Sequence, residues 1–184
     1  RARRLSAVGE DDWGHGHENG PAQEDSALAG AATAVAAGGL GPAARTTVDE
    51  LLAQAREGLY RFTPEELAAA MESGAEPGPD SPPLVIDIRD RDDRERTGMI
   101  AGSISIPLLV LEWRCDPISG HSHPAVRSLD QPVVTVCNEG YTSSFAAASL
   151  RRLGFSRAAD LEGGVEGWAA AGLPITEATE DVRA

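Results

Sequence analysis

The feature that most constrains the fold of this 184-residue chain is a pair of short, almost continuous apolar runs, at residues 84–88 and 133–136. Each run has the length of a single strand, and neither alternates regularly with polar residues as a half-exposed strand does. Segments of helical composition lie between and after the two runs, so strands and helices alternate along the chain. We therefore predict an α/β domain whose small central sheet is mainly parallel and whose ligands bind at the carboxyl ends of the strands.

Helix signals surround these runs. The segments TVDE at 47–50 and TPEE at 63–66 are capping boxes, in which a threonine hydroxyl and a glutamate carboxylate each bond a backbone N–H at the helix start. They predict helices that end near residues 58 and 74. A longer helix is predicted over 142–153, where Gly154 stops it. Further strands are predicted at 103–106 and 158–161, and further short helices at 108–114 and 165–171.

The first 44 residues differ in composition from the rest of the chain. They contain 12 Ala and 8 Gly, and Trp13 is their single aromatic residue. A segment with so few large apolar side chains buries too little surface to offset the entropy of ordering it. We predict a flexible tail at residues 1–44, one domain at 45–176 and a short C-terminal tail at 177–184.

Composition excludes several classes of function. All 16 basic residues are Arg, so Schiff-base lysine chemistry and a lysine-containing phosphate loop are excluded. The formal net charge of −13 disfavours nucleic acid as a partner. The weakly polar stretch at 26–40 is shorter than the roughly 18 apolar residues of a membrane span. We therefore expect no membrane binding. Two cysteines are too few for a disulfide scaffold, so we expect reduced thiols and a cytoplasmic protein.

Cys137 stands where the second apolar run ends and the loop before the helix at 142–153 begins. Such a loop gathers backbone N–H groups, which stabilise an anion together with the dipole of the following helix. Gly140 lets the loop turn its amides inward without a Cβ penalty. We therefore predict that Cys137 is a reactive thiolate nucleophile. The alternative is a buried structural cysteine, which is the commoner role of an isolated Cys.

Five blocks in order resemble a single-domain rhodanese. They are residues 84–89, 102–107, 133–137 with Gly140, 161–165, and Trp168 followed by 172–174. The resemblance spans roughly residues 63–175. It implies a rhodanese-like three-layer α/β/α fold in which the cysteine at the end of the fourth strand carries a persulfide.

The resemblance also implies a function, that of a sulfurtransferase. Sulfane sulfur would pass from thiosulfate, mercaptopyruvate or a thiol persulfide, through a Cys137 persulfide, to a thiol, sulfite or cyanide acceptor. No cofactor and no metal are implied, and a protein partner could bind the N-terminal tail. Asp87 and Arg89 match the family's Asp-x-Arg, whose implied role is to support the catalytic loop or to hold an anionic substrate. The alternative is that they form a plain ion pair at the end of a strand. The substrate-binding loop would consist of Asn138, Glu139, Gly140, Tyr141 and Thr142.

Two features of the cysteine loop bear on the alternative functions. The loop contains no basic residue, which makes the thiosulfate dianion a less certain donor and leaves room for a catalytically idle module that binds a partner or senses oxidants. Phosphatases and arsenate reductases on this fold place an Arg six residues after the cysteine, where it grips the oxyanion. Ser143 occupies that position here, so oxyanion chemistry is disfavoured.

Four weaker signals receive ordinary interpretations. The His and Cys residues lack the spacing of a zinc site, so we predict no metal. A disulfide between Cys115 and Cys137 is a minor redox hypothesis. Trp113 and Trp168 are predicted to lie in the core. The charged run at 90–96 is predicted to be a solvated face.

Overall fold

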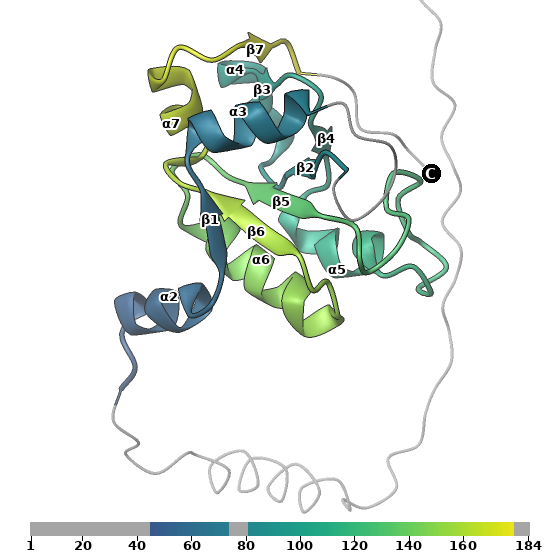
Figure 1. Cartoon of the computed structure of the whole chain (residues 1–184). Coiled ribbons are helices and arrows are strands. Elements are labelled where there is room, and N and C mark those ends of the chain that lie inside the picture. The colour runs from purple at the N-terminus through teal and green to yellow at the C-terminus, as the bar shows by residue number, and fades with distance from the viewer. Residues whose placement is uncertain (1–44, 74–80, 179–184) are drawn as a thin grey trace, which may run out of the picture. The chain divides into compact units, whose positions relative to one another are not determined.

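A computed structural model describes residues 45–73 and 81–178 of the chain (Figure 1). The tail predicted at residues 1–44 and the last six residues of the C-terminal tail lie outside the described residues. The central sheet has five strands in the order β1-β6-β5-β2-β4, and every neighbouring pair is parallel. These strands are β1 (Tyr60–Phe62), β2 (Leu84–Asp87), β4 (Ile104–Ser105), β5 (Val133–Val136) and β6 (Ala158–Leu161). A separate antiparallel pair joins β3 (Met99–Ile100) to β7 (Ile175–Thr176).

Helices cover both faces of this sheet, which confirms the predicted three-layer α/β/α fold (Figure 1). They are α2 (Val48–Arg56), α3 (Pro64–Glu72), α4 (Arg91–Thr97), α5 (Leu111–Cys115) after the 3₁₀ turn η1 (Leu108–Val110), α6 (Thr142–Leu153) and α7 (Gly164–Ala170). In Figure 1, α2, α5 and α6 lie on one side of the sheet and α3 and α7 on the other. No helix within residues 45–73 and 81–178 is both long enough and apolar enough to cross a membrane.

The capping signals in the sequence act as predicted. Thr47 Oγ1 accepts a hydrogen bond from Glu50 N at 3.2 Å, and Glu50 Oε2 accepts one from Thr47 N at 2.8 Å. The same reciprocal pair starts α3. Helix α6 ends at Gly154, whose φ of 116° closes the last turn in the left-handed region that glycine tolerates.

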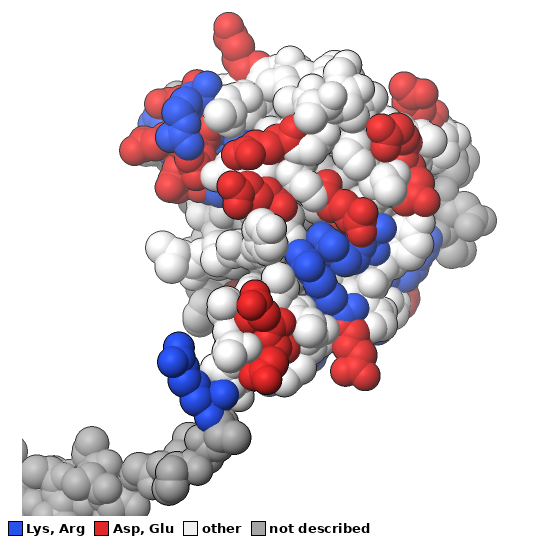
Figure 2. Space-filling model, turned by 90° about the vertical axis from the view of Figure 1, so that its left-hand side faces the viewer, with Lys and Arg blue, Asp and Glu red and all other residues white. Residues whose placement is uncertain are grey.

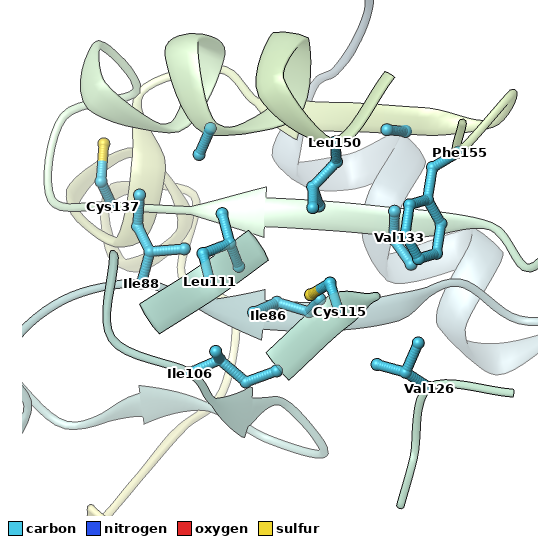
Figure 3. Packing of buried hydrophobic residues seen from close by; sticks show 12 residues of the cluster. Ile86, Ile88, Ile106, Leu111, Cys115, Val126, Val133, Cys137, Leu150 and Phe155 are labelled. Carbon is cyan, nitrogen blue, oxygen red and sulfur yellow. The ribbon is translucent and has the colours of Figure 1, made fainter. Parts of the chain in front are cut away.

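Strand β5 forms the centre of the molecule, because all four of its residues are buried. Its alternate side chains enter two cores, one on each face of the sheet. Val133 packs with Leu111, Leu150 and Phe155 beneath α5 and α6, as Figure 3 shows. Val134 and Val136 belong to the other core, with residues of α3 and α7. A strand that is covered on both faces is almost wholly apolar rather than alternating. Thr135, its one polar residue, is buried with its hydroxyl donating to the Ser143 carbonyl at 2.9 Å.

Three sequence predictions need correction. The charged run at 90–96 is not simply a solvated face: most of it forms α4, and Arg94 is 1% exposed and donates to the Arg89 carbonyl at 2.6 Å. Trp113 is 60% exposed, so its assignment to the core was wrong, whereas Trp168 is buried as predicted. Both cysteines are free thiols, so the structure holds no disulfide between them.

Candidate active site

Cys137 follows β5, the central strand, directly and so lies at the carboxyl end of the parallel strands. Its side chain lines a cavity of about 400 Å³. The cavity is lined by Ile88, Arg89, Asp93, Cys137, Asn138, Glu139, Tyr141, Thr142 and Glu166. The structure therefore gathers most of the predicted site residues around one opening, with Gly140 and Asp87 behind the lining. Asp93 and Glu166 also line it, and sequence analysis had not assigned them to the site.

Backbone amides of the following loop point at the sulfur. The N–H groups of Gly140 and Ser143 donate to Cys137 Sγ at N···S distances of 3.2 and 3.4 Å. Gly140 adopts a φ of +79°, and a Cβ atom there would lie 2.8 Å from the Leu161 carbonyl oxygen. Both facts require glycine at this position. The loop therefore presents two N–H donors to the sulfur.

The loop's carbonyl groups point the other way and are held by the start of α7. Val165 N–H donates to the Cys137 carbonyl at 2.9 Å, and Glu166 N–H donates to the Asn138 carbonyl at 3.0 Å. Gly164 has a φ of +58°, and a Cβ atom on it would lie 2.4 Å from each of these two carbonyl oxygens. The close approach that fixes the loop therefore depends on glycine at residue 164.

Asp87 and Arg89 form a buried ion pair beside the loop, with Nη2 of Arg89 2.6 Å from Oδ2 of Asp87. Arg89 Nε also donates to Asp87, at 3.0 Å. The other Arg89 donors reach Thr97 Oγ1 at 2.7 Å, the Gly98 carbonyl at 2.6 Å and Asn138 Oδ1 at 3.2 Å. A guanidinium has five N–H groups, and protein acceptors engage all of them here. This arrangement favours loop support over direct binding of an anionic substrate as the role of Arg89.

The opening of the cavity is acidic. Asn138 Nδ2 donates to Asp93 Oδ2 at 3.0 Å. This hydrogen bond, aided by Arg96, holds the pKa of Asp93 below its usual value against the opposing effect of burial. Glu139 and Glu166 add two more carboxylates to the lining, and its one cation, Arg89, is paired. Figure 2 faces the edge toward which β5 and β6 point in Figure 1, and acidic side chains are spread across that face.

A buried polar cluster lies behind the sulfur. The Cys137 thiol donates to Ser143 Oγ at 3.3 Å, and Ser143 Oγ donates to Asp160 Oδ2 at 3.4 Å. Ser144 Oγ donates to the same oxygen at 2.7 Å. Asp160 is fully buried in β6 and pairs with Arg61 at 2.9 Å. Sequence analysis missed this cluster, although a carboxylate inside the otherwise apolar run AADL was a signal that a buried partner must exist.

Cys115 lies in a different environment. It ends α5 within the core and has no exposed surface. Burial, with Glu112 adding and Arg114 opposing, raises the pKa of the Cys115 thiol to about 12. It is therefore an inert thiol at neutral pH. Within residues 45–73 and 81–178, no group of His, Cys, Asp and Glu side chains could hold a metal ion.

Comparisons with known proteins match this geometry to a family. The family model described as Rhodanese-like domain matches residues 63–171. Thiosulfate sulfurtransferase GlpE of Stutzerimonas stutzeri is 32% identical over 111 residues, which cover 59% of this chain and 83% of that protein. GlpE of Pseudomonas aeruginosa is 35% identical over 108 residues, covering 59% of this chain and 82% of its own.

A solved structure is also similar. It is that of a protein of unknown function from Rhodopseudomonas palustris, described as a possible tyrosine phosphatase. The match has a TM-score of 0.64 at 30% identity and covers 75% of this chain and 100% of that one.

Proposed function

Because this chain belongs to the rhodanese-like domain family, we propose that it is a sulfurtransferase that carries sulfane sulfur on Cys137. The observation that carries the proposal is the pair of amides aimed at Cys137 Sγ from Gly140 and Ser143. These donors suit both a thiolate nucleophile and the anionic outer sulfur of a persulfide.

The first half-reaction transfers sulfur from donor to protein. The Cys137 thiolate attacks the outer sulfur of a donor such as thiosulfate. A new S–S bond forms to Cys137 while the donor's own S–S bond breaks, and its electron pair leaves with sulfite. The protein's negative charge moves from Cys137 Sγ to the outer sulfur of the persulfide, one S–S bond away, and so remains on a sulfur beside the loop amides.

The second half-reaction regenerates the thiolate. An acceptor thiolate, sulfite or cyanide attacks the outer persulfide sulfur, forms a bond to it and displaces the Cys137 thiolate. No net oxidation occurs over the cycle, and no cofactor is required. A cavity of about 400 Å³ admits donors and acceptors of the size of thiosulfate, mercaptopyruvate or a cysteine persulfide.

We infer that the donor carries less negative charge than thiosulfate. Asp93, Glu139 and Glu166 line the cavity, and Arg89 offers no unused donor. Asp93 is paired with Arg96, but a dianion would still meet repulsion from Glu139 and Glu166. The two GlpE proteins are named for thiosulfate, so this preference would distinguish the present chain from those relatives.

Two other functions deserve direct comparison in the same assay. The description of the Rhodopseudomonas palustris protein raises a phosphatase, but Ser143 here is fully buried and replaces the Arg that would grip an oxyanion. The absence of a basic residue from the loop suggests the second alternative, a catalytically idle module that binds a partner or senses oxidants. Both alternatives predict no sulfur gain by Cys137.

Intact-protein mass spectrometry tests the proposal. The protein is incubated separately with thiosulfate, with mercaptopyruvate and with cysteine persulfide, and Cys137→Ser serves as the control. We expect a gain of one sulfur atom with mercaptopyruvate or the persulfide, slower loading with thiosulfate, and no gain in the variant. Absence of loading by all three donors, or loading of Cys137→Ser, would overturn the proposal. Hydrolysis of an aryl phosphate in place of sulfur gain would favour the phosphatase.

A further inference from the structure

Two arginines reach the active-site loop from the N-terminal part of the domain. Arg56, the last residue of α2, donates through Nη2 to the Gly140 carbonyl at 2.9 Å. Arg61, in β1, donates through Nη2 to the same oxygen at 3.2 Å. Both residues precede residue 63, where the family match begins. One loop carbonyl therefore accepts from two guanidinium groups that lie 84 and 79 positions away in sequence.

This carbonyl belongs to the residue whose N–H faces the sulfur. A loop that turns its amides inward must turn carbonyls outward, and a buried carbonyl requires a donor there. The N-terminus of α7 provides donors for Cys137 and Asn138 but not for Gly140, which is buried. The two arginines fill this gap.

The charges of the two arginines are not equivalent. Arg61 is paired with buried Asp160 at 2.9 Å and approaches Glu162 at 3.4 Å. Arg56 instead donates to Ser144 Oγ at 3.0 Å and lies over the Tyr141 ring, 5.6 Å from its centroid. Within residues 45–73 and 81–178, no carboxylate forms an ion pair with Arg56. Arg56 is linked to Asp160 through Ser144 Oγ, which donates to Asp160 Oδ2 at 2.7 Å, but Asp160 is already paired directly with Arg61. The two arginines therefore share one buried carboxylate.

All other charged groups around Cys137 are either paired or negative. On the cavity side, Arg89 is paired with Asp87. The remaining charged lining residues on that side are Asp93, Glu139 and Glu166. In the part of the chain that the structure describes, Arg56 is thus the one cation in contact with the loop that has no direct carboxylate partner.

We propose that Arg56 and Arg61 are positioning residues for Cys137: together they hold the loop by the Gly140 carbonyl, and Arg56 supplies the positive charge that the loop's own sequence lacks. This inference rests on the proposed role of Cys137 as nucleophile. Arg56 takes the electrostatic part, because its charge has no direct carboxylate partner. Arg61 takes the structural part, because it links the same carbonyl to Asp160 and so to the polar cluster behind the sulfur.

The test measures the pH at which iodoacetamide alkylation of Cys137 reaches half of its plateau rate. Alkylation needs no sulfur donor, and buried Cys115 does not compete. The variants are Arg56→Gln and Arg56→Lys. Arg151→Gln is the matched control, since Arg151 also donates to a backbone carbonyl, that of Gly58, away from the loop.

We expect Arg56→Gln to move the alkylation midpoint up by about one pH unit, because a positive charge held against the loop is lost. Arg56→Lys should recover most of this shift because it keeps the charge, although it loses the two-pronged geometry. Arg151→Gln should leave the midpoint unchanged. An unchanged midpoint in Arg56→Gln overturns the electrostatic role, whether or not thermal stability falls.

Arg61 is tested in a form that leaves no buried charge unpaired. The single change Arg61→Gln would strand Asp160, so the double variant Arg61→Gln, Asp160→Asn is used instead. We expect slower loading of sulfur with a smaller midpoint shift than Arg56→Gln, because the net charge is conserved while one loop anchor is lost. Loading at the rate of the unmodified protein would overturn the structural role. If no protein loads sulfur but Arg56→Gln still shifts the midpoint, the proposed function fails and the electrostatic role of Arg56 stands.

Discussion

The two cysteines of this chain are both buried, yet their surroundings differ in kind. Cys115 is enclosed by apolar side chains of the core near Ile86, whereas Cys137 lies at the end of the sheet beside a loop of amides (Figure 3). Burial raises the pKa of Cys115 to about 12, with Glu112 adding to the rise and Arg114 opposing it only in part. At Cys137 the backbone replaces that water with oriented N–H groups. We therefore propose that the direction of nearby peptide groups, rather than burial alone, distinguishes Cys137 from Cys115.

Replacing each cysteine by serine tests the difference between Cys137 and Cys115 most directly. Cys137→Ser should reduce sulfur transfer by about a thousandfold or more, because a hydroxyl is a far weaker nucleophile at neutral pH. Cys115→Ser should keep turnover within a few-fold. Steady-state rates with the best donor, combined with circular dichroism to confirm folding, provide the measurement. A comparable loss in Cys115→Ser would make that thiol a second participant.

Glycine substitutions measure how much the close packing of the loop against α7 contributes to stability. Gly164→Ala would place a methyl group 2.4 Å from two loop carbonyl oxygens, in addition to straining a φ of +58°. Gly172→Ala strains a φ of +74° with no atom within 4 Å, so it isolates the backbone effect. We expect losses in unfolding free energy of about 3 and about 1 kcal/mol respectively. Denaturant titration of both variants measures the difference, and equal losses would contradict the proposed steric contact.

The raised pKa of Cys115 should make the free energy of unfolding depend on pH in the alkaline range. The folded protein keeps this thiol protonated up to about pH 12, while the unfolded chain releases the proton above its ordinary pKa of 9.0. The unfolded state then binds fewer protons, so the stability that burial of the neutral thiol contributes is lost as pH rises above that value. From about pH 8 to about pH 10, the parent protein should lose about 1 kcal/mol more than Cys115→Ala. Parallel pH profiles of unfolding free energy would refute this expectation.

The smallest expected effect concerns the acidic lining. Glu139→Gln removes one exposed carboxylate beside Cys137, so loading from the thiosulfate dianion should accelerate about two- to threefold, while loading from cysteine persulfide, which carries less negative charge, changes less. Salt should reduce the difference between the two proteins. Glu72→Gln, on α3 away from the cavity, is the matched control. Equal acceleration with both donors would show that the change acts through something other than charge.

Local signals predicted the framework well. Capping boxes and Gly154 act within a single helix turn, so the sequence at 47–50, 63–66 and 142–154 was sufficient to place α2, α3 and α6. Strand β1 was missed because three residues are too few to display a pattern. Its order beside β6 depends on pairing about 99 positions apart, as the Arg61 to Asp160 contact illustrates.

The loop that holds Cys137 was predictable from the sequence, but its supports were not. Strand, cysteine, glycine and helix follow one another in sequence, so the loop around Cys137 could be inferred from a single window. Arg56, Asp93 and Asp160 come from separate elements and approach the loop only in the folded chain. Their charges look like ordinary surface residues in a sequence, since burial and partners arise from tertiary contacts.

The outward carbonyls of the loop have a consequence for how the protein is made. Their partners are Arg56 and Arg61 on one side of the chain and Val165 and Glu166 on the other. A growing chain that ends soon after Cys137 lacks the last two of these donors, and closing such separated contacts is slow relative to forming a helix. The cysteine therefore acquires its chemical setting only when residue 166 has been synthesised and the domain has closed around it. Until then its sulfur is an ordinary thiol.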